Sequence, residues 1–181
     1  MKTKKLIKAL RVPPGRKINL SQDFDPSDTG GVPNRETARA LLAKNVEKLS
    51  RLQEMLYAQD TYSVLIVLQA MDAAGQDSAI KHVMSGVNPQ GCEVHSFKAP
   101  SALELDHDFL WRCWLRLPQR GRIGIFNRSY YEEVLVVRVH PELLEKQRLP
   151  ARAVRGDLWR RRFRDINRMD RYLVDYGPVI L

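Results

Sequence analysis

Residues that bind metals are scarce in this sequence. Its 181 residues include two cysteines and four histidines. The cysteines, Cys92 and Cys113, form no CxxC or Cys/His pattern, and the histidines are scattered. The ligand spacing of a zinc site is therefore missing, and we expect two reduced, partly buried thiols.

Long hydrophobic runs are also missing. No apolar stretch approaches the roughly 20 residues that a membrane-spanning helix needs. The first 17 residues are basic, but Lys8 and Arg11 interrupt their apolar positions, which is not typical of a secretory signal. We therefore expect a cytoplasmic protein without a membrane partner, with enough residues for one domain and its core.

Acidic residues are absent from one segment and sparse in another. Residues 1–17 hold seven Lys and Arg and no acid, and residues 146–171 hold ten Lys and Arg against three Asp. Each segment carries a net charge of +7, so the rest of the chain sums to −5 within the total of +9. Positive charge placed in this way indicates a polyanionic partner: nucleic acid, an anionic membrane surface or a phosphate polymer.

Apolar periodicity and turn residues predict alternating helices and strands. An extended segment over residues 12–34 leads to a helix that Asn34 caps and that runs to about residue 58. Strands are expected at residues 63–69, 92–97, 123–127 and from 179, and helices at 77–87, 102–117, 130–139 and 153–176. This order predicts an α/β fold with a mostly parallel sheet. Ligands of such sheets bind beyond the carboxyl ends of strands, here after Leu68, Phe97 and Phe126.

The loop after the first expected strand is similar to a Walker phosphate loop. Aligned with G-x-x-x-x-G-K-[ST], residues 70–77 keep the second glycine as Gly75 and replace the lysine with Gln76. Backbone N–H groups in a glycine turn at a helix N-terminus form an anion site whatever the side chains are. The alternative is an ordinary strand-to-helix turn without a ligand.

Three long segments, Phe24–Asp60, Tyr62–Arg112 and Ile123–Leu144, contain the runs FDPSDTGGVPN, LQAMDAAGQDSAIKHV and IGIFNRSYYEEVLVVRVH. In these runs the chain closely resembles the polyphosphate kinase type 2 family, in particular its class that acts on nucleoside mono- and diphosphates. The resemblance implies a P-loop kinase-like, thymidylate-kinase-like fold, a mostly parallel sheet sandwiched by helices. It implies polyphosphate as donor, a nucleoside mono- or diphosphate as acceptor, Mg²⁺ and a homo-oligomer. Residues 35–181 would be an incomplete kinase domain and residues 1–34 a basic arm and extended segment.

Roles for single residues follow from the same resemblance. Asp72, Asn127 and Arg128 would be catalytic, with Asp72 holding Mg²⁺ or the acceptor phosphate. Phosphate contacts are expected from Ala74, Gly75, Gln76, Lys81, Lys98, Arg112 and Arg128. Lys81 and Arg112 could instead be solvated helix residues, and an exposed helix start explains Glu132 and Glu133 as well as a functional role does.

The sequence departs from the family pattern in three respects. Gln76 replaces the loop lysine, Ala79 replaces a hydroxyl residue, and the chain ends at Leu181, before the lid and the last strands. An exposed sheet edge with apolar surface is therefore expected. We expect weak or no phosphotransferase activity. The alternatives are an active phosphotransferase completed by a partner chain and a non-catalytic polyanion-binding module, with nucleic acid the less favoured ligand.

Overall fold

A computed structural model describes residues 7–8, 10–25, 27–71 and 74–181. The chain divides into two units, residues 1–45 and 46–181, which are described separately below. The border predicted after Asn34 stays a prediction.

Two side chains of the first unit begin helices. Asn19 caps α2 (Leu20–Asp23), because its Oδ1 accepts a hydrogen bond from Ser21 N–H at 3.2 Å. The Oδ1 of Asn34 accepts from Thr37 N–H at 2.8 Å, at the start of α3 (Arg35–Gln59). Each bond satisfies a backbone donor that the first helical turn leaves unpaired. The predicted cap at Asn34 is confirmed, and α3 ends one residue beyond the expected limit.

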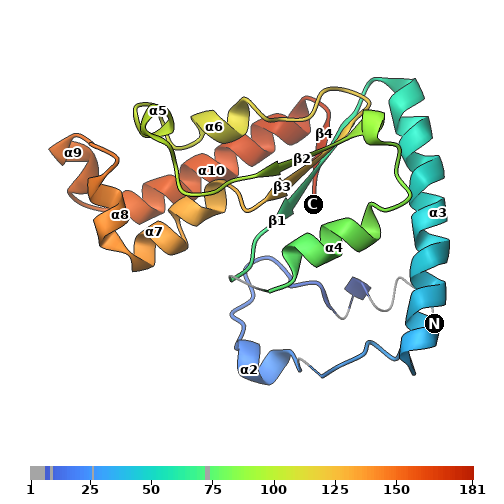
Figure 1. The fold of residues 1–181 in the computed structure, drawn as a ribbon. Helices are drawn as coiled ribbons and strands as arrows, with labels where there is room; N and C mark the ends of the chain where they lie inside the picture. The colour runs from blue at the N-terminus through green and yellow to red at the C-terminus, as the bar shows by residue number, and fades with distance from the viewer. Residues whose placement is uncertain (1–6, 9, 26, 72–73) are drawn as a thin grey trace. The chain divides into compact units, whose positions relative to one another are not determined.

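The second unit is built on a parallel sheet with strand order β2-β3-β1-β4 in the described residues (Figure 1). Its strands are β1 (Ser63–Leu68), β2 (Cys92–Ser96), β3 (Ile123–Asn127) and β4 (Pro178–Ile180). β3 is central and buried at all five positions, as its apolar run Ile-Gly-Ile-Phe requires. The predicted α/β fold with a parallel sheet is confirmed.

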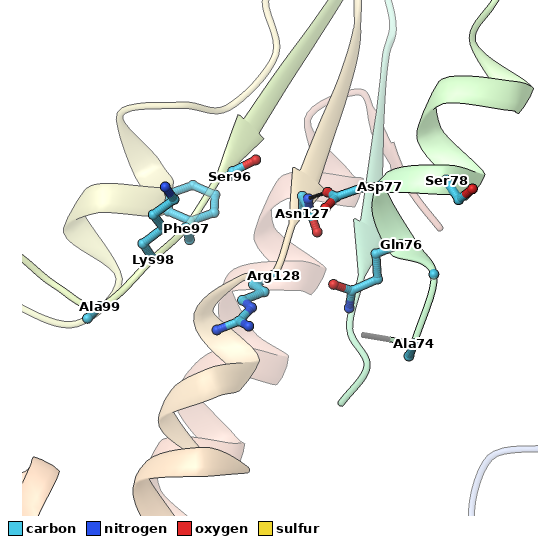
Figure 2. A pocket seen from close by; sticks show the side chains of 11 residues that line it. Ala74, Gln76, Asp77, Ser78, Ser96, Phe97, Lys98, Ala99, Asn127 and Arg128 are labelled. Carbon is cyan, nitrogen blue, oxygen red and sulfur yellow. Dashed lines mark hydrogen bonds between the residues drawn. The ribbon is translucent and has the colours of Figure 1, made fainter. Parts of the chain in front are cut away.

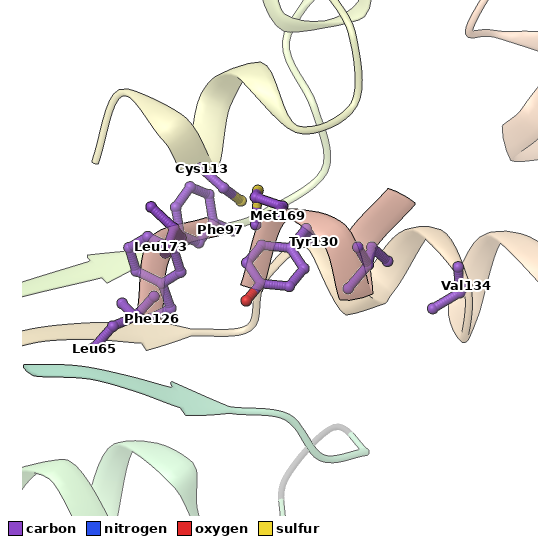
Figure 3. Close-up of a cluster of buried hydrophobic side chains, with 9 residues drawn as sticks. Leu65, Phe97, Cys113, Phe126, Tyr130, Val134, Met169 and Leu173 are labelled. Atoms are coloured by element: carbon purple, nitrogen blue, oxygen red, sulfur yellow. The ribbon is translucent and has the colours of Figure 1, made fainter. Parts of the chain in front are cut away.

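Helices cover both faces of this sheet. Leu65 of β1 and Phe126 of β3 pack with Ile166, Met169 and Leu173 of α10 (Leu158–Asp175), and α6 (Trp111–Trp114) adds Cys113 to the same cluster (Figure 3). α4 (Gln76–Val83) lies on the other side of the strands (Figures 1 and 3). The core thus lies between the sheet and the α6–α10 layer.

Four expected helices are shorter or interrupted. The one expected at 102–117 divides into α5 (Ala102–Leu105) and α6, because Asp108 Oδ1 accepts from Leu110 N–H at 2.9 Å in a local turn that competes with helix. The last one divides at Gly156, whose φ of +83° ends α9 (Ala151–Val154) before α10. The helix expected at 77–87 ends at Val83.

The helix expected at 130–139 is also interrupted. It consists of the 3₁₀ turn η2 (Tyr130–Glu133) and α7 (Val136–Val139), after which α8 (Pro141–Glu145) follows. A further 3₁₀ turn, η1 (Pro89–Gly91), precedes β2. In the described part of the chain, no helix is both long and apolar enough to cross a membrane. The expected cytoplasmic location stays a prediction.

A buried ion pair joins α10 to η2. Arg162 Nη1 donates to the main-chain oxygen of Glu133 at 3.0 Å and to its carboxylate at 3.2 Å, and both side chains are only 4% exposed. Gln147 bridges the two, donating to Glu133 at 2.6 Å and accepting from Arg162. The guanidinium also faces the rings of Phe109 and Trp159 at 4.9 and 5.6 Å. Burial lowers the pKa of Arg162, and the neighbouring carboxylates oppose that shift.

Replacement of Arg162 by methionine should lower the free energy of unfolding by about 3–5 kcal/mol, because the Glu133 carboxylate is left buried without its counter-charge. Arg160, with an 87% exposed side chain on the same helix, provides the matched control, and Arg160→Met should change stability by less than about 0.5 kcal/mol. Urea unfolding of both variants measures the difference. A loss below about 1 kcal/mol for Arg162→Met would contradict this view of the pair.

Candidate functional site

A cavity of about 600 Å³ opens at the carboxyl ends of the strands, where the parallel topology places ligands. Its walls come from three segments: the start of α4, the end of β2 with the residues after it, and the end of β3 (Figure 2). The lining residues are Ala74, Gly75, Gln76, Asp77, Ser78, Ser96, Phe97, Lys98, Ala99, Asn127 and Arg128. The site expected after Leu68, Phe97 and Phe126 is therefore one cavity.

Gly75 makes the turn into α4. It occupies the N-cap position with φ +92° and ψ 14°, in the left-handed region. Its carbonyl accepts from Ala79 N–H at 2.9 Å, so the helix begins immediately after the turn. The N-terminus of this helix borders the cavity, where backbone N–H groups and the helix dipole favour an anion.

Gln76 takes the place in this turn that a lysine has in the Walker pattern. Among the described residues, its buried Nε2 has no hydrogen-bond partner. Its side chain and that of Arg128 both line the cavity, Gln76 from the start of α4 and Arg128 from the end of β3 (Figure 2). A buried amide donor without a partner costs free energy, and a phosphate oxygen is one group that would satisfy it.

Asp77 and Asn127 connect the helix to the central strand. Asn127 Nδ2 donates to Asp77 Oδ1 at 2.6 Å, across 50 residues of sequence. The Asp77 carboxylate also lies in the first turn of α4, where the helix dipole stabilises a negative charge. The contact fixes the start of α4 relative to the end of β3.

Arg128 adopts an uncommon backbone conformation, with φ +64° in a residue that is not glycine. Its N–H donates to the carbonyl of Leu68 at 2.9 Å, which ties the turn after β3 to the end of β1. Gln69 supports the same turn through its amide, which accepts from Ser129 Oγ at 3.2 Å and donates to Glu132. Such strained residues persist where surrounding contacts hold them, and they cluster at functional sites.

Two tyrosines tie η2 to α10 behind this turn. Tyr130 and Tyr131 donate to the two carboxylate oxygens of Asp170, at 2.6 and 3.1 Å. Burial, together with the negative charge of Asp170, raises the pKa of Tyr131 to about 12 and raises that of Tyr130 further. Both hydroxyls therefore stay protonated at neutral pH and act as structural donors.

The structure brings six predicted residues together at the cavity: Ala74, Gly75, Gln76, Lys98, Asn127 and Arg128. Lys81 is exposed on α4 and is not among the lining residues of the described part. Arg112 is buried, at 9% exposure, so the alternative of a solvated side chain is wrong. Asp72 lies outside the described residues, and its predicted role stays a prediction.

Sequence reasoning gave no role to several side chains of the site. Asp77, Ser78 and Ser96 line the cavity, and Gln69 holds the Arg128 turn. The signal for Asp77 was its alignment with the last position of the Walker pattern, and Ser78 directly follows it. Glu133 is buried against Arg162, so the exposed helix start considered for it is wrong, whereas Glu132 is half-buried and contacts Gln69.

A family model described as Polyphosphate kinase 2 (PPK2) matches residues 33–181. The chain belongs to this family. It is 50% identical over 178 residues to an ADP-polyphosphate phosphotransferase of Rhodopseudomonas palustris, a match that covers 96% of this chain and 60% of that protein. It is 43% identical to an AMP/ADP-polyphosphate phosphotransferase of Meiothermus ruber, covering 97% of this chain and 61% of the relative.

Solved structures agree with the family. Polyphosphate Kinase 2 from Arthrobacter aurescens TC1 superposes with a TM-score of 0.83 at 35% identity, over 97% of this chain and 59% of that one. This likeness confirms the expected P-loop kinase-like fold. The chain spans about 60% of the length of these relatives.

Replacement of Gly75 by alanine should destabilise the second unit by about 1–2 kcal/mol, because a Cβ disfavours the left-handed backbone. In the described part of the chain, no atom beyond the two neighbouring residues lies within 4 Å of the added Cβ, so we expect the cost to be conformational and not steric. Gly75→Asn is the matched control, since asparagine tolerates this conformation better, and it should cost less. Urea unfolding compares the three proteins. Equal losses for alanine and asparagine would show that backbone conformation is not the cause.

Proposed function

We propose that this chain binds inorganic polyphosphate in the 600 Å³ cavity and transfers phosphate to AMP or ADP weakly or not at all. The observation that carries the proposal is Gln76, whose buried amide lies where the family pattern has a lysine. An amide offers a phosphate oxygen a hydrogen bond but no charge. The cavity therefore keeps the backbone and side-chain donors that bind polyphosphate. The negative charge that develops on the transferring phosphoryl group, however, loses one stabilising cation.

The charges that line the cavity support binding. Among the described lining residues, Lys98 and Arg128 contribute two positive charges and Asp77 one carboxylate, and the N-terminus of α4 adds its dipole. Arg128 presents a planar guanidinium that suits two phosphate oxygens at once. These groups come from three separate segments, so a phosphate chain bound among them would be held in a fixed orientation.

Magnesium fits the donor set of this cavity. The lining includes the Asp77 carboxylate and the hydroxyls of Ser78 and Ser96, all oxygen ligands. The described residues hold no group of three or more acids, histidines or cysteines, but Mg²⁺ at phosphoryl-transfer sites takes only one or two carboxylates beside phosphates and water. Asp77, together with Asp72 as expected from the resemblance, would hold the ion, which would neutralise charge on the phosphate oxygens.

A second candidate is a fully active phosphotransferase that a partner chain completes. The observation in its favour is that the chain spans 60% of a relative named as an ADP-polyphosphate phosphotransferase. A partner that supplies the remaining cations and covers the cavity would strengthen each electrostatic contact inside it, because water would be excluded. Homo-oligomerisation stays a prediction. A non-catalytic polyanion-binding module is the third candidate.

Gln76→Lys should strengthen polyphosphate binding and raise the rate of AMP or ADP phosphorylation by on the order of 10² to 10³, because it restores a cation at the transferring group. Transfer and binding are measured on the same preparation, with polyphosphate as donor and Mg²⁺ present. The matched control is Gln90→Lys, which adds the same charge on η1, before the start of β2. It should leave both quantities unchanged.

Each alternative has its own outcome in this experiment. Transfer by the unaltered chain at the rate of the full-length Rhodopseudomonas relative would contradict the proposal of weak activity. Activity that rises only after a partner chain is added would favour the second candidate. Salt-sensitive binding of DNA in place of polyphosphate would favour the third.

A further inference from the structure

Arg112 lies behind the cavity wall. Its Nη1 donates to the main-chain oxygen of Lys98 at 2.7 Å, and its guanidinium carbon is 5.5 Å from the centroid of the Phe97 ring. The Phe97 ring packs edge-to-face on Phe126 of the central strand at 4.8 Å. Arg112 is thus held by a charge-assisted hydrogen bond and a ring that the core fixes.

The surroundings of Arg112 suit a structural cation better than a phosphate ligand. Arg112 is not one of the described residues that line the 600 Å³ cavity. The small cavity that it does line also contains the carboxylates of Glu104, Asp108 and Glu133. A third cavity, of about 140 Å³, is lined by Arg112 together with the acids Glu132 and Glu133 and the cations Lys98, Arg128 and Lys146. A polyanion that approached the guanidinium from the small cavity would meet the three carboxylates, and in the 140 Å³ cavity Arg112 is buried, with its Nη1 already bonded to the Lys98 carbonyl.

The hydrogen bond acts on the backbone from which Lys98 projects. Because a peptide group is planar, a donor that fixes the Lys98 carbonyl fixes the whole Lys98–Ala99 plane. Lys98 and Ala99 both line the large cavity, and Lys98 is otherwise exposed on a flexible stem. A fixed backbone reduces the conformational freedom that Lys98 loses when it contacts a ligand.

We propose that Arg112 is a positioning residue that orients Lys98 toward bound polyphosphate and does not itself contact phosphate. This inference rests on the proposed function, since it assumes that polyphosphate occupies the cavity. It replaces the role expected from the family resemblance, in which Arg112 would bind phosphate directly.

A double-mutant cycle of Arg112→Met and Lys98→Met separates the two roles. Each single variant should weaken polyphosphate binding about tenfold, the size of one lost charged partner. The double variant should bind no more weakly than Lys98→Met. The logarithm of the association constant decreases with log[salt], and the magnitude of this slope should be smaller by about 0.7–0.9 in Lys98→Met, as for one phosphate contact of a nucleic acid. In the double variant the magnitude should decrease no further.

Arg116→Met is the matched control, because Arg116 is an exposed arginine in the same segment. It should leave the Lys98 effect unchanged. Should Arg112→Met fail to fold, as judged by circular dichroism, Arg112→Lys replaces it in the cycle. Its expected loss is smaller, because lysine keeps a charged donor, but it is not zero, because lysine lacks the planar guanidinium. If the losses of binding free energy in the two single variants add up in the double variant, and the salt slope loses two contacts in place of one, Arg112 is a phosphate ligand. This result would overturn the inference.

Trypsin provides a readout that needs no ligand, because it cleaves after Lys98 only where the backbone can open. Arg112→Met should raise the rate of cleavage at Lys98–Ala99 in the folded protein at least severalfold, and Arg116→Met should not. An unchanged rate would overturn the inference. Failure of the unaltered chain to bind polyphosphate would instead overturn the proposed function, and the cleavage rates would still decide whether Arg112 holds the Lys98 segment.

Discussion

The parallel pairing of β3 with both β1 and β2 is the constraint on which the rest of the structure depends. Leu68, Ser96 and Asn127 are the last residues of these strands, and Asn127 pairs with both of the others. The three following segments therefore start at one edge of the sheet. β3 can hold this central place because all its residues are buried and none is charged. A charged residue in β3 would lose its solvation without a partner.

Cross-links between the segments then shape this edge. The carbonyl of Asn127 accepts from Phe97 N–H at 3.0 Å, and Arg128 N–H donates to Leu68 at 2.9 Å. The side chain of Asn127 reaches Asp77 on α4. Each bond joins residues that are far apart in sequence, so the cavity is rigid only when the sheet is formed. Behind the edge, Arg162 and Asp170 of α10 hold η2, and Arg112 of α6 holds the Lys98 segment.

Positive charge is distributed unevenly between binding and structure. Lys98 and Arg128 line the cavity, whereas Arg112 and Arg162 are buried and satisfied by protein acceptors. Net charge and its clusters in sequence do not separate these uses. Arg160 and Arg162 occur two positions apart in one basic run, yet the first is solvated and the second is a core residue. An arginine that looks functional by pattern can therefore serve the fold.

The sequence by itself determined the class of fold, the strand positions and the family, because apolar periodicity and long local motifs are properties of neighbouring residues. It also named Gly75, Gln76, Lys98, Asn127 and Arg128 as site residues, and the structure places these five at one cavity, while their roles stay predictions. Only the tertiary structure decided that the helices expected at 102–117 and 130–139 are interrupted, that Glu133 is buried and that Arg112 lies behind the wall. Those outcomes depend on partners 14 to 29 residues away, such as Lys98 for Arg112 and Arg162 for Glu133, or on local turns that compete with helix. Sequence spacing does not encode such contacts, because they exist only after the sheet and α10 have packed.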